Sequence, residues 1–159
     1  MLTLIATFNL PAFKTEFINE PDRQLAIENF FKSFDANGWC IFHLKYILYK
    51  NENEVLFKFN NLVKGFLRSC ETIGKFVFGT HQVFGEEPSL VCEGVWLIQG
   101  TDVLDALKES DTFDTYTWTK LDHTKAEDRA KVAQFWNCRK EDEDSIEGLG
   151  RLRTFKWIK

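Results

Sequence analysis

The side chains best suited to metal binding or nucleophilic catalysis are few in this sequence and stand far apart. They are three histidines and four cysteines: His43, His81, His123, Cys40, Cys70, Cys92 and Cys138. A zinc site needs three or four such ligands to converge, and only His81 with Cys70 or Cys92 offers a beginning. The sequence has no CxxC pair and none of the motifs GxGxxG, GxxxxGK(S/T), HExxH or GxSxG. We therefore predict neither an enzyme, nor a cofactor, nor a metal site.

Aromatic residues close to cations indicate binding instead. In the segment 39–48 every even position is apolar or aromatic, which marks a buried strand face. The odd positions carry Trp39, His43 and Lys45, so we predict that this is the outer face of the strand. Exposed aromatic side chains beside lysines are typical of surfaces that bind a partner.

We expect this surface to continue across the neighbouring strands. The partner-binding residues predicted on it are Trp39, His43, Lys45, Trp96, Tyr116, Trp118 and Lys120. Aromatics interleaved with lysines also stack on single-stranded nucleic acid, so RNA or tRNA binding by this face is the alternative function. A further alternative is that a helix over residues 124–138 covers the face and makes it a second core layer.

The composition is that of one soluble globular domain. A chain of 159 residues suits a single compact unit, and 16 of its 24 aromatic residues are phenylalanine, which belongs in a core because it has no polar group. The net charge of −4 argues against a basic nucleic-acid footprint over the domain as a whole. Dispersed cysteines, no signal peptide and no apolar run of about 18 residues favour a reduced, cytoplasmic protein without a membrane span.

Charge is unevenly distributed near the C-terminus. Residues 141–144 form the acidic run Glu-Asp-Glu-Asp, and four basic residues follow it: Arg151, Arg153, Lys156 and Lys159. A solvated loop followed by a solvated strand or tail explains this pattern. The alternative is a pair of oppositely charged surfaces that face a partner.

Three segments have helical patterns, and six have strand patterns. The helices are expected over 9–19, 20–35 and 124–138, and the last opens on Thr124-Lys125-Ala126-Glu127, the pattern of a capping box. The strands are expected over 39–48, 55–67, 76–84, 91–98 and 116–120, with a weaker edge strand over 151–158.

Residues 55–67 also fit a helix, and we favour a strand followed by a short helical turn near 68–73. Residues 101–112 are polar, with one helical turn possible around 103–107. Consecutive strands between flanking helices argue for an α+β fold with a mainly antiparallel sheet of about five strands.

Seven short phrases in a fixed order resemble one known family. They are Phe13-Lys14-Thr15-Glu16-Phe17, Asn19-Glu20, Phe34-Asp35 with Gly38-Trp39, Asn61-Leu62-Val63-Lys64-Gly65-Phe66, Phe84-Gly85, Gly94-Val95-Trp96 with Gly100, and Tyr116-Thr117-Trp118 with Lys120-Leu121-Asp122. In this order and spacing they resemble the C-terminal domain of the gamma subunit of eukaryotic translation elongation factor 1. The resemblance runs from Phe8 to Lys159.

The resemblance implies an α+β domain with a curved antiparallel sheet. It also implies a non-catalytic scaffold role in the guanine-nucleotide exchange complex that recharges the tRNA-delivering GTPase. The partners expected on this basis are other elongation factor 1 subunits, with aminoacyl-tRNA synthetases as further candidates. Residues 1–159 are expected to be this domain alone, without the glutathione S-transferase-like domain and linker that precede it in the family. The loop at 86–90 and the acidic run at 141–144 depart from the family pattern.

Overall fold

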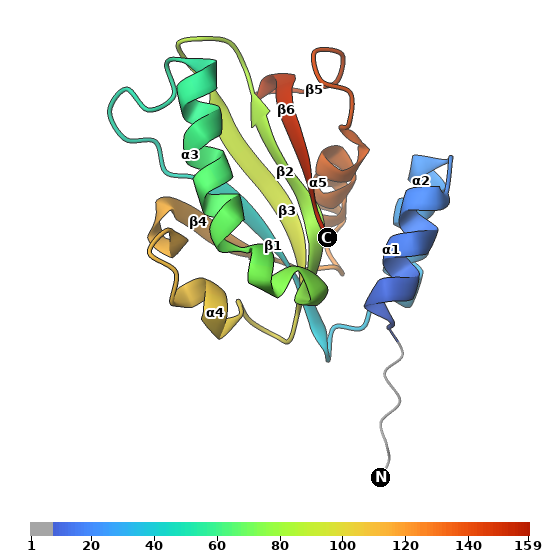
Figure 1. Ribbon diagram of the computed structural model, residues 1–159. Coiled ribbons are helices and arrows are strands. Elements are labelled where there is room, and N and C mark those ends of the chain that lie inside the picture. Colours follow the sequence, from blue (N-terminus) through green and yellow to red (C-terminus); the bar gives the residue numbers. More distant parts are fainter. Residues whose placement is uncertain (1–7) are drawn as a thin grey trace.

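The computed structural model describes residues 8–159, and it shows one curved antiparallel sheet with helices on both faces (Figure 1). The sheet has six strands in the order β4-β1-β3-β2-β6-β5, and every neighbouring pair is antiparallel. The strands are β1 (Trp39–Tyr46), β2 (Val77–Phe84), β3 (Val91–Gln99), β4 (Tyr116–Leu121), β5 (Ser145–Ile146) and β6 (Gly150–Ile158). The predicted α+β class is confirmed, with one strand more than expected.

The helices divide between the two faces of the sheet, with α3 on one and α5, α1 and α2 on the other (Figure 1). The α-helices are α1 (Leu10–Asn19), α2 (Arg23–Ser33), α3 (Leu56–Ser69), α4 (Asp105–Lys108) and α5 (Ala126–Asn137). Two 3-10 turns, η1 (Glu71–Phe76) and η2 (Phe113–Thr115), lead into β2 and β4. Within residues 8–159, none of the helices combines the length and apolar character needed to span a membrane.

Each face of the sheet has its own hydrophobic core. Since side chains alternate along a strand, adjacent residues of β3 belong to different cores: Val95 and Leu97 pack under α5, while Trp96 and Ile98 pack under α3. The core under α5, α1 and α2 is rich in phenylalanine, as the composition predicts, and Trp136 of α5 lies completely buried in it. A two-sided sheet explains why β2 is buried along its whole length.

The first two helices begin where the sequence indicates. The Asn9 side chain accepts a hydrogen bond from the Ala12 amide at 3.0 Å, and Asp22 does the same for Leu25 at 3.1 Å. These N-caps satisfy amides that have no partner inside the helix. The helices predicted over 9–19 and 20–35 are thus confirmed.

The strand favoured over 55–67 is wrong, because this segment forms most of α3. Its buried residues Phe59, Val63 and Phe66 are spaced by four and three positions, which places them on one face of a helix against the sheet. The predicted capping box at 124–127 is also wrong. The Thr124 hydroxyl donates a hydrogen bond of 2.6 Å to the Asp122 carboxylate, and α5 begins without a side-chain cap.

The predicted outer face of β1 is wrong as well. Its Ile41 is 1% exposed and belongs to the core under α5, and His43 lies beneath Phe135 of that helix with 7% exposed. The alternative of a second core layer under the helix at 124–138 is the correct one. Only Lys45, near the end of this face, is exposed.

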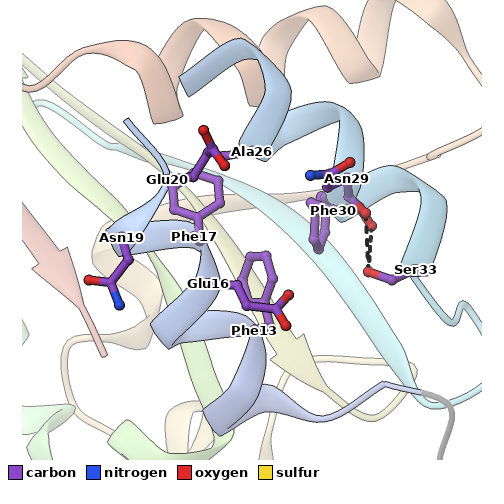
Figure 2. Close-up of a pocket in the computed structure, with 9 residues that line it drawn as sticks. All are labelled: Phe13, Glu16, Phe17, Asn19, Glu20, Ala26, Asn29, Phe30 and Ser33. Atoms are coloured by element: carbon purple, nitrogen blue, oxygen red, sulfur yellow. Dashed lines mark hydrogen bonds between the residues drawn. The ribbon is translucent and has the colours of Figure 1, made fainter. Parts of the chain in front are cut away.

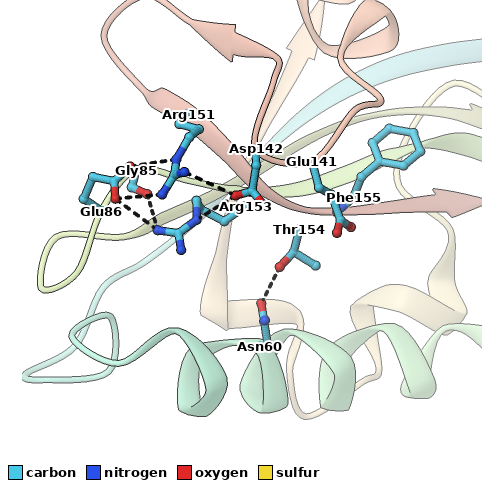
Figure 3. A network of polar contacts seen from close by, with 9 residues as sticks. All are labelled: Asn60, Gly85, Glu86, Glu141, Asp142, Arg151, Arg153, Thr154 and Phe155. Atoms are coloured by element: carbon cyan, nitrogen blue, oxygen red, sulfur yellow. Dashed lines mark hydrogen bonds and ion pairs between the residues drawn. The ribbon is translucent and has the colours of Figure 1, made fainter.

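The acidic run at 141–144 pairs with the first half of β6 rather than with solvent alone (Figure 3). Arg151 forms a two-pronged contact with Glu86, with both distances 3.0 Å, and Arg153 bridges Glu86 at 3.3 Å and Asp142 at 3.5 Å. Glu141 accepts a hydrogen bond from the Phe155 amide at 2.9 Å. These contacts join the 85–90 loop, the 141–144 turn and β6, and they neutralise both arginines.

Candidate functional site

The structure separates the seven predicted site residues between the two faces of the sheet. Trp39, His43 and Lys45 point to the α5 side, whereas Trp96, Tyr116, Trp118 and Lys120 point to the α3 side. Trp96 is 0% exposed and Tyr116 is 3% exposed, so neither reaches the surface. The predicted single docking face therefore does not exist, and the structure gives each remaining residue its own surroundings.

Trp39 and Lys120 nevertheless meet at one end of the sheet, where three of the sequence phrases converge. A cavity of about 390 Å³ opens there, which we name the motif cleft. Its lining residues are Phe34, Ala36, Trp39, Cys40, Lys120, Leu121, Asp122 and His123. They come from the turn before β1 and from the end of β4.

A tight turn brings Trp39 to the cleft. The Asp35 side chain accepts a hydrogen bond from the Asn37 amide at 3.0 Å, and the Asp35 carbonyl accepts one from the Trp39 amide, also at 3.0 Å. The turn is joined to the end of β3, because the Gly100 amide donates to the Gly38 carbonyl at 2.7 Å. Gly100 has a φ of +101°, a conformation that glycine adopts without strain. The geometry of this corner thus explains Gly100.

The opposite wall is held by equally specific contacts. The Lys120 ammonium donates a hydrogen bond to the Thr101 carbonyl at 2.7 Å, so one of its three protons is used and its charge stays at the rim. The rings of Phe34 and His123 lie 4.9 Å apart in a tilted pair. Trp39, half-buried, packs its indole on Phe8 at 5.1 Å. The result is a cavity with aromatic walls that is lined by one lysine and one carboxylate, Asp122.

Two ionisable groups of the motif cleft have shifted pKa values. Burial raises the pKa of the Cys40 thiol to about 11, so this cysteine is protonated near neutral pH and is a poor nucleophile. Hydrogen bonds from the side chain and the amide of Thr124 lower the pKa of the Asp122 carboxyl, so it stays ionised. Among residues 8–159, no three His, Cys, Asp or Glu side chains are placed to hold a metal ion. Cys40 and Asp122 are thus not activated for nucleophilic attack or proton donation near neutral pH.

The other predicted residues lie in two further places. His43 forms a buried pair with Glu93, with 2.6 Å between the imidazole Nε2 and the carboxylate, at the floor of a cavity of about 320 Å³ that Lys45 and Lys131 also line. Glu93 was not predicted as a site residue, because only the β1–β3 register brings it beside His43. Trp118 is half-buried, and its indole donates to the Phe113 carbonyl at 3.1 Å.

Under α3, a second histidine joins a fully buried cluster. The Nε2 atom of His81 lies 2.8 Å from the Tyr116 hydroxyl and 3.4 Å from the Cys92 sulfur. Burial lowers the pKa of His81 to about 3 and raises that of Cys92 to about 12. The ring of Phe66 lies over His81 and Tyr116 at 5.5 and 4.3 Å, which closes the cluster to solutes. The histidine–cysteine group considered for zinc is thus a sealed part of the core.

A third cavity lies between α1 and α2 (Figure 2). Phe13, Phe17 and Phe30 form its apolar floor, and Glu16 and Glu20 stand at its rim. The three rings are buried members of the core, so this cavity marks the junction of the two helices rather than a separate cluster of reactive groups.

These features define a class: an α+β domain whose two-sided antiparallel sheet carries an aromatic cleft at one end. The family follows from comparison with known proteins. Residues 3–102 match the family model described as elongation factor 1 gamma, conserved domain, and the chain belongs to this family.

Individual relatives agree with this assignment. The chain is 30% identical to elongation factor 1-gamma of Schizosaccharomyces pombe over 130 residues, which cover 82% of this chain and 32% of that protein. It is 30% identical to elongation factor 1-gamma 2 of Saccharomyces cerevisiae over 149 residues, covering 90% and 36%. With the protein from Rattus norvegicus it shares 28% identity over 134 residues, covering 83% and 30%. The chain thus spans about a third of the length of these relatives.

Proposed function

We propose that this chain is a non-catalytic interaction domain of the translation elongation factor 1 guanine-nucleotide exchange complex, and that it acts as a scaffold in the cytoplasm. Its partners in this proposal are other subunits of that complex, with aminoacyl-tRNA synthetases as further candidates. The family membership supports the complex. The observation that carries the interaction role is the motif cleft, where two phrases that resemble the family surround a half-buried indole and a lysine, and a third phrase adjoins them through Gly100.

The cleft suits a side chain of a protein partner. Its aromatic walls favour an apolar or aromatic group, and the two unused protons of the Lys120 ammonium favour a neighbouring carboxylate. Docking by Trp39 and Lys120 is therefore the part of the predicted surface that we retain as a proposal. The alternative of RNA stacking on one aromatic face loses its basis, because Trp39 and Trp96 lie on opposite sides of the sheet.

A blocking variant tests this proposal without removing a core residue. Ala36 is exposed and lines the cleft, so Ala36→Arg fills the cavity from the turn and leaves Trp39 in place. The immobilised chain is incubated with purified elongation factor 1 subunits, and the bound subunits are quantified. We expect the unmodified chain to retain at least one subunit, and Ala36→Arg to lose about tenfold or more in affinity, since an anchor of about 1.4 kcal/mol or more is displaced.

Ala106→Arg is the matched control, because Ala106 is an exposed alanine of α4 that does not line the cleft. It should bind like the unmodified chain. If no subunit is retained, or if both arginine variants bind as well as the unmodified chain, the proposed docking site is wrong.

A further inference from the structure

The two halves of β6 differ in how their basic residues are compensated. Arg151 and Arg153 are paired with Glu86 and Asp142, as described above (Figure 3). Among the described residues, Lys156 and Lys159 form no ion pair, and residues 1–7 contain no aspartate or glutamate that supplies one. The second half of the strand therefore keeps its positive charge.

Helix α3 brings further cations to the same place. A hydrogen bond of 2.9 Å between Asn60 and Thr154 fixes the helix alongside β6. Residues four and eight positions after Asn60 lie on the same side of the helix, and they are Lys64 and Arg68. Both side chains are exposed, and neither forms an ion pair among the described residues.

These residues form the two banks of a groove of about 390 Å³, which we name the basic groove. Its banks are Lys64 and Arg68 on α3, with Lys156 on β6 and Lys159 directly after it, and Glu71 is the one acidic side chain in its lining. Its remaining lining residues are Leu67, Cys70, Gly74, Trp157 and Ile158. Four basic side chains thus face one acidic side chain in a chain whose net charge is −4.

The positive charge extends beyond the lining. Lys14 of α1 donates a hydrogen bond of 3.0 Å to the carbonyl of Gly74, so a fifth cation lies beside the groove. Partial burial, and secondly the charge of Lys159, lower the pKa of Lys14, which agrees with an accumulation of like charges at this place. Such a cluster attracts a polyanion.

We propose that the basic groove binds the phosphate backbone of single-stranded RNA. An RNA strand that runs along the groove contacts cations on both banks. Leu67 and Ile158 are partly buried and form an apolar floor that accommodates ribose and base surfaces. The cations alone follow the RNA backbone here, because the indole of Trp157 packs on Phe17 and Phe78 on the other face of the sheet, so we expect binding without sequence preference. This site is separate from the motif cleft, so it stands or falls independently of the docking proposed above.

Fluorescence anisotropy with a fluorescein-labelled single-stranded RNA of about 16 nucleotides tests the proposal. Four phosphate contacts predict that the logarithm of the association constant falls with the logarithm of the salt concentration, with a slope of about −3. The variant Lys64→Glu/Arg68→Glu reverses two charges on the exposed side of α3. We expect it to lower the affinity about tenfold at about 50 mM salt and to reduce the slope to about −1.5.

The control variant Lys32→Glu/Lys50→Glu makes the same change of net charge at exposed positions outside the groove. Its affinity and salt slope should stay close to those of the unmodified chain. A circular dichroism spectrum verifies the fold of each variant, and Arg68→Gln/Lys156→Gln replaces the first variant if charge reversal disturbs α3.

Three results overturn the proposal. One is no binding of the RNA at about 50 mM salt. Another is an equal loss of affinity in the groove variant and the control, which shows unspecific attraction. The third is displacement of the RNA by poly-glutamate at equal charge concentration, which identifies an acidic protein segment as the ligand instead.

Discussion

The two faces of the sheet hold their helices in different ways. Under α5, polar side chains of β2 reach the end of the helix: Gln82 donates to the Phe135 carbonyl at 2.7 Å, and Thr80 donates to the same oxygen at 3.4 Å. Trp136 of α5 returns a hydrogen bond of 3.0 Å from its indole to the Val95 carbonyl of β3. These contacts satisfy groups that a helix end and a buried indole otherwise leave unpaired.

Under α3, the attachment is almost entirely apolar. Phe59, Val63 and Phe66 pack on the sheet, and the buried polar groups beneath them bond to one another rather than to the helix. Within residues 8–159, the indole nitrogen of Trp96 and the Nδ1 atom of His81 have no hydrogen-bond partner. Apolar packing therefore dominates under α3, with the Asn60–Thr154 hydrogen bond at its edge, whereas hydrogen bonds from buried side chains position α5.

The largest effect is expected at Gly79, whose missing side chain points to the α3 face of β2. A Cβ atom there would lie 2.2 Å from the Val95 carbonyl oxygen and 2.8 Å from the Trp96 Cα, both in the backbone of the neighbouring strand. We predict that Gly79→Ala destabilises the protein by about 3 kcal/mol, because the sheet must shift to admit a methyl group. Urea unfolding followed by circular dichroism measures this.

Gly65→Ala on the exposed side of α3 is the contrasting variant. A Cβ atom there meets nothing within 4 Å, so alanine should stabilise the helix by about 0.5–1 kcal/mol. If Gly79→Ala is as harmless as Gly65→Ala, the close approach of β2 and β3 on the α3 face is not a feature of the protein in solution.

The next largest expected effect is a loss of folding stability at acid pH, and it arises from His81 on the α3 face of the sheet. Because burial lowers the folded-state pKa of His81 from 6.5 to about 3, the unfolded chain binds a proton between these values and the folded chain does not. This contribution to stability is complete above about pH 6.5 and is lost as the pH falls toward 3, at about 1.4 kcal/mol per pH unit. Between pH 6.5 and 5 the loss is about 2 kcal/mol.

The variant His81→Gln isolates this contribution, because all other titrating groups are shared with the unmodified chain. Urea unfolding at pH 6.5 and pH 5 should show a stability loss about 2 kcal/mol smaller in the variant. Identical losses in both proteins would mean that His81 becomes protonated in the folded state and that the cluster under α3 is open to water.

The smallest expected effect is a difference in stability between variants of two buried tryptophans on opposite faces of the sheet. Trp136→Phe removes the indole hydrogen bond to Val95 and leaves that carbonyl without this donor, whereas Trp96→Phe removes an indole nitrogen with no partner among the described residues. Both side chains are 0% exposed, so the loss of volume is comparable. We predict that Trp136→Phe costs about 1 kcal/mol more than Trp96→Phe. Equal costs, measured by thermal unfolding of both variants, would remove the distinction between polar and apolar attachment.

The sequence predicted the elements whose signals are local. Asn9 caps α1, and the alternation of side chains after Trp39 predicts β1. Both signals are local, because capping and strand periodicity depend on neighbouring residues. The prediction of a strand over 55–67 was wrong because the phenylalanines of this segment fit both a period of two and a helical spacing. Packing of Phe59, Val63 and Phe66 on the sheet decides between them, and that contact involves residues distant in the chain.

The candidate site was also predicted only in part, because it depends on contacts between residues that are distant in the chain. The three aromatic phrases stood out in the sequence, but their meeting point depends on the bond between Gly100 and Gly38 and on the contact of Lys120 with Thr101. The basic groove was visible only as a charged C-terminus, because its second bank comes from α3, which the sequence analysis took for a strand.

By itself, the sequence determined the fold class, the alternation of side chains along β1 and the family to which the phrases point. This alternation holds in the structure, whereas the single face predicted for Trp39 and Trp96 does not. Which face is covered, and by which helix, was decided only by tertiary packing. The indole of Trp136 meets the Val95 carbonyl 41 positions earlier in the chain, and α5 thereby buries the face of β1 that looked free. Local patterns carry no information about such long-range burial, since the stabilising contacts exist only once the chain has folded.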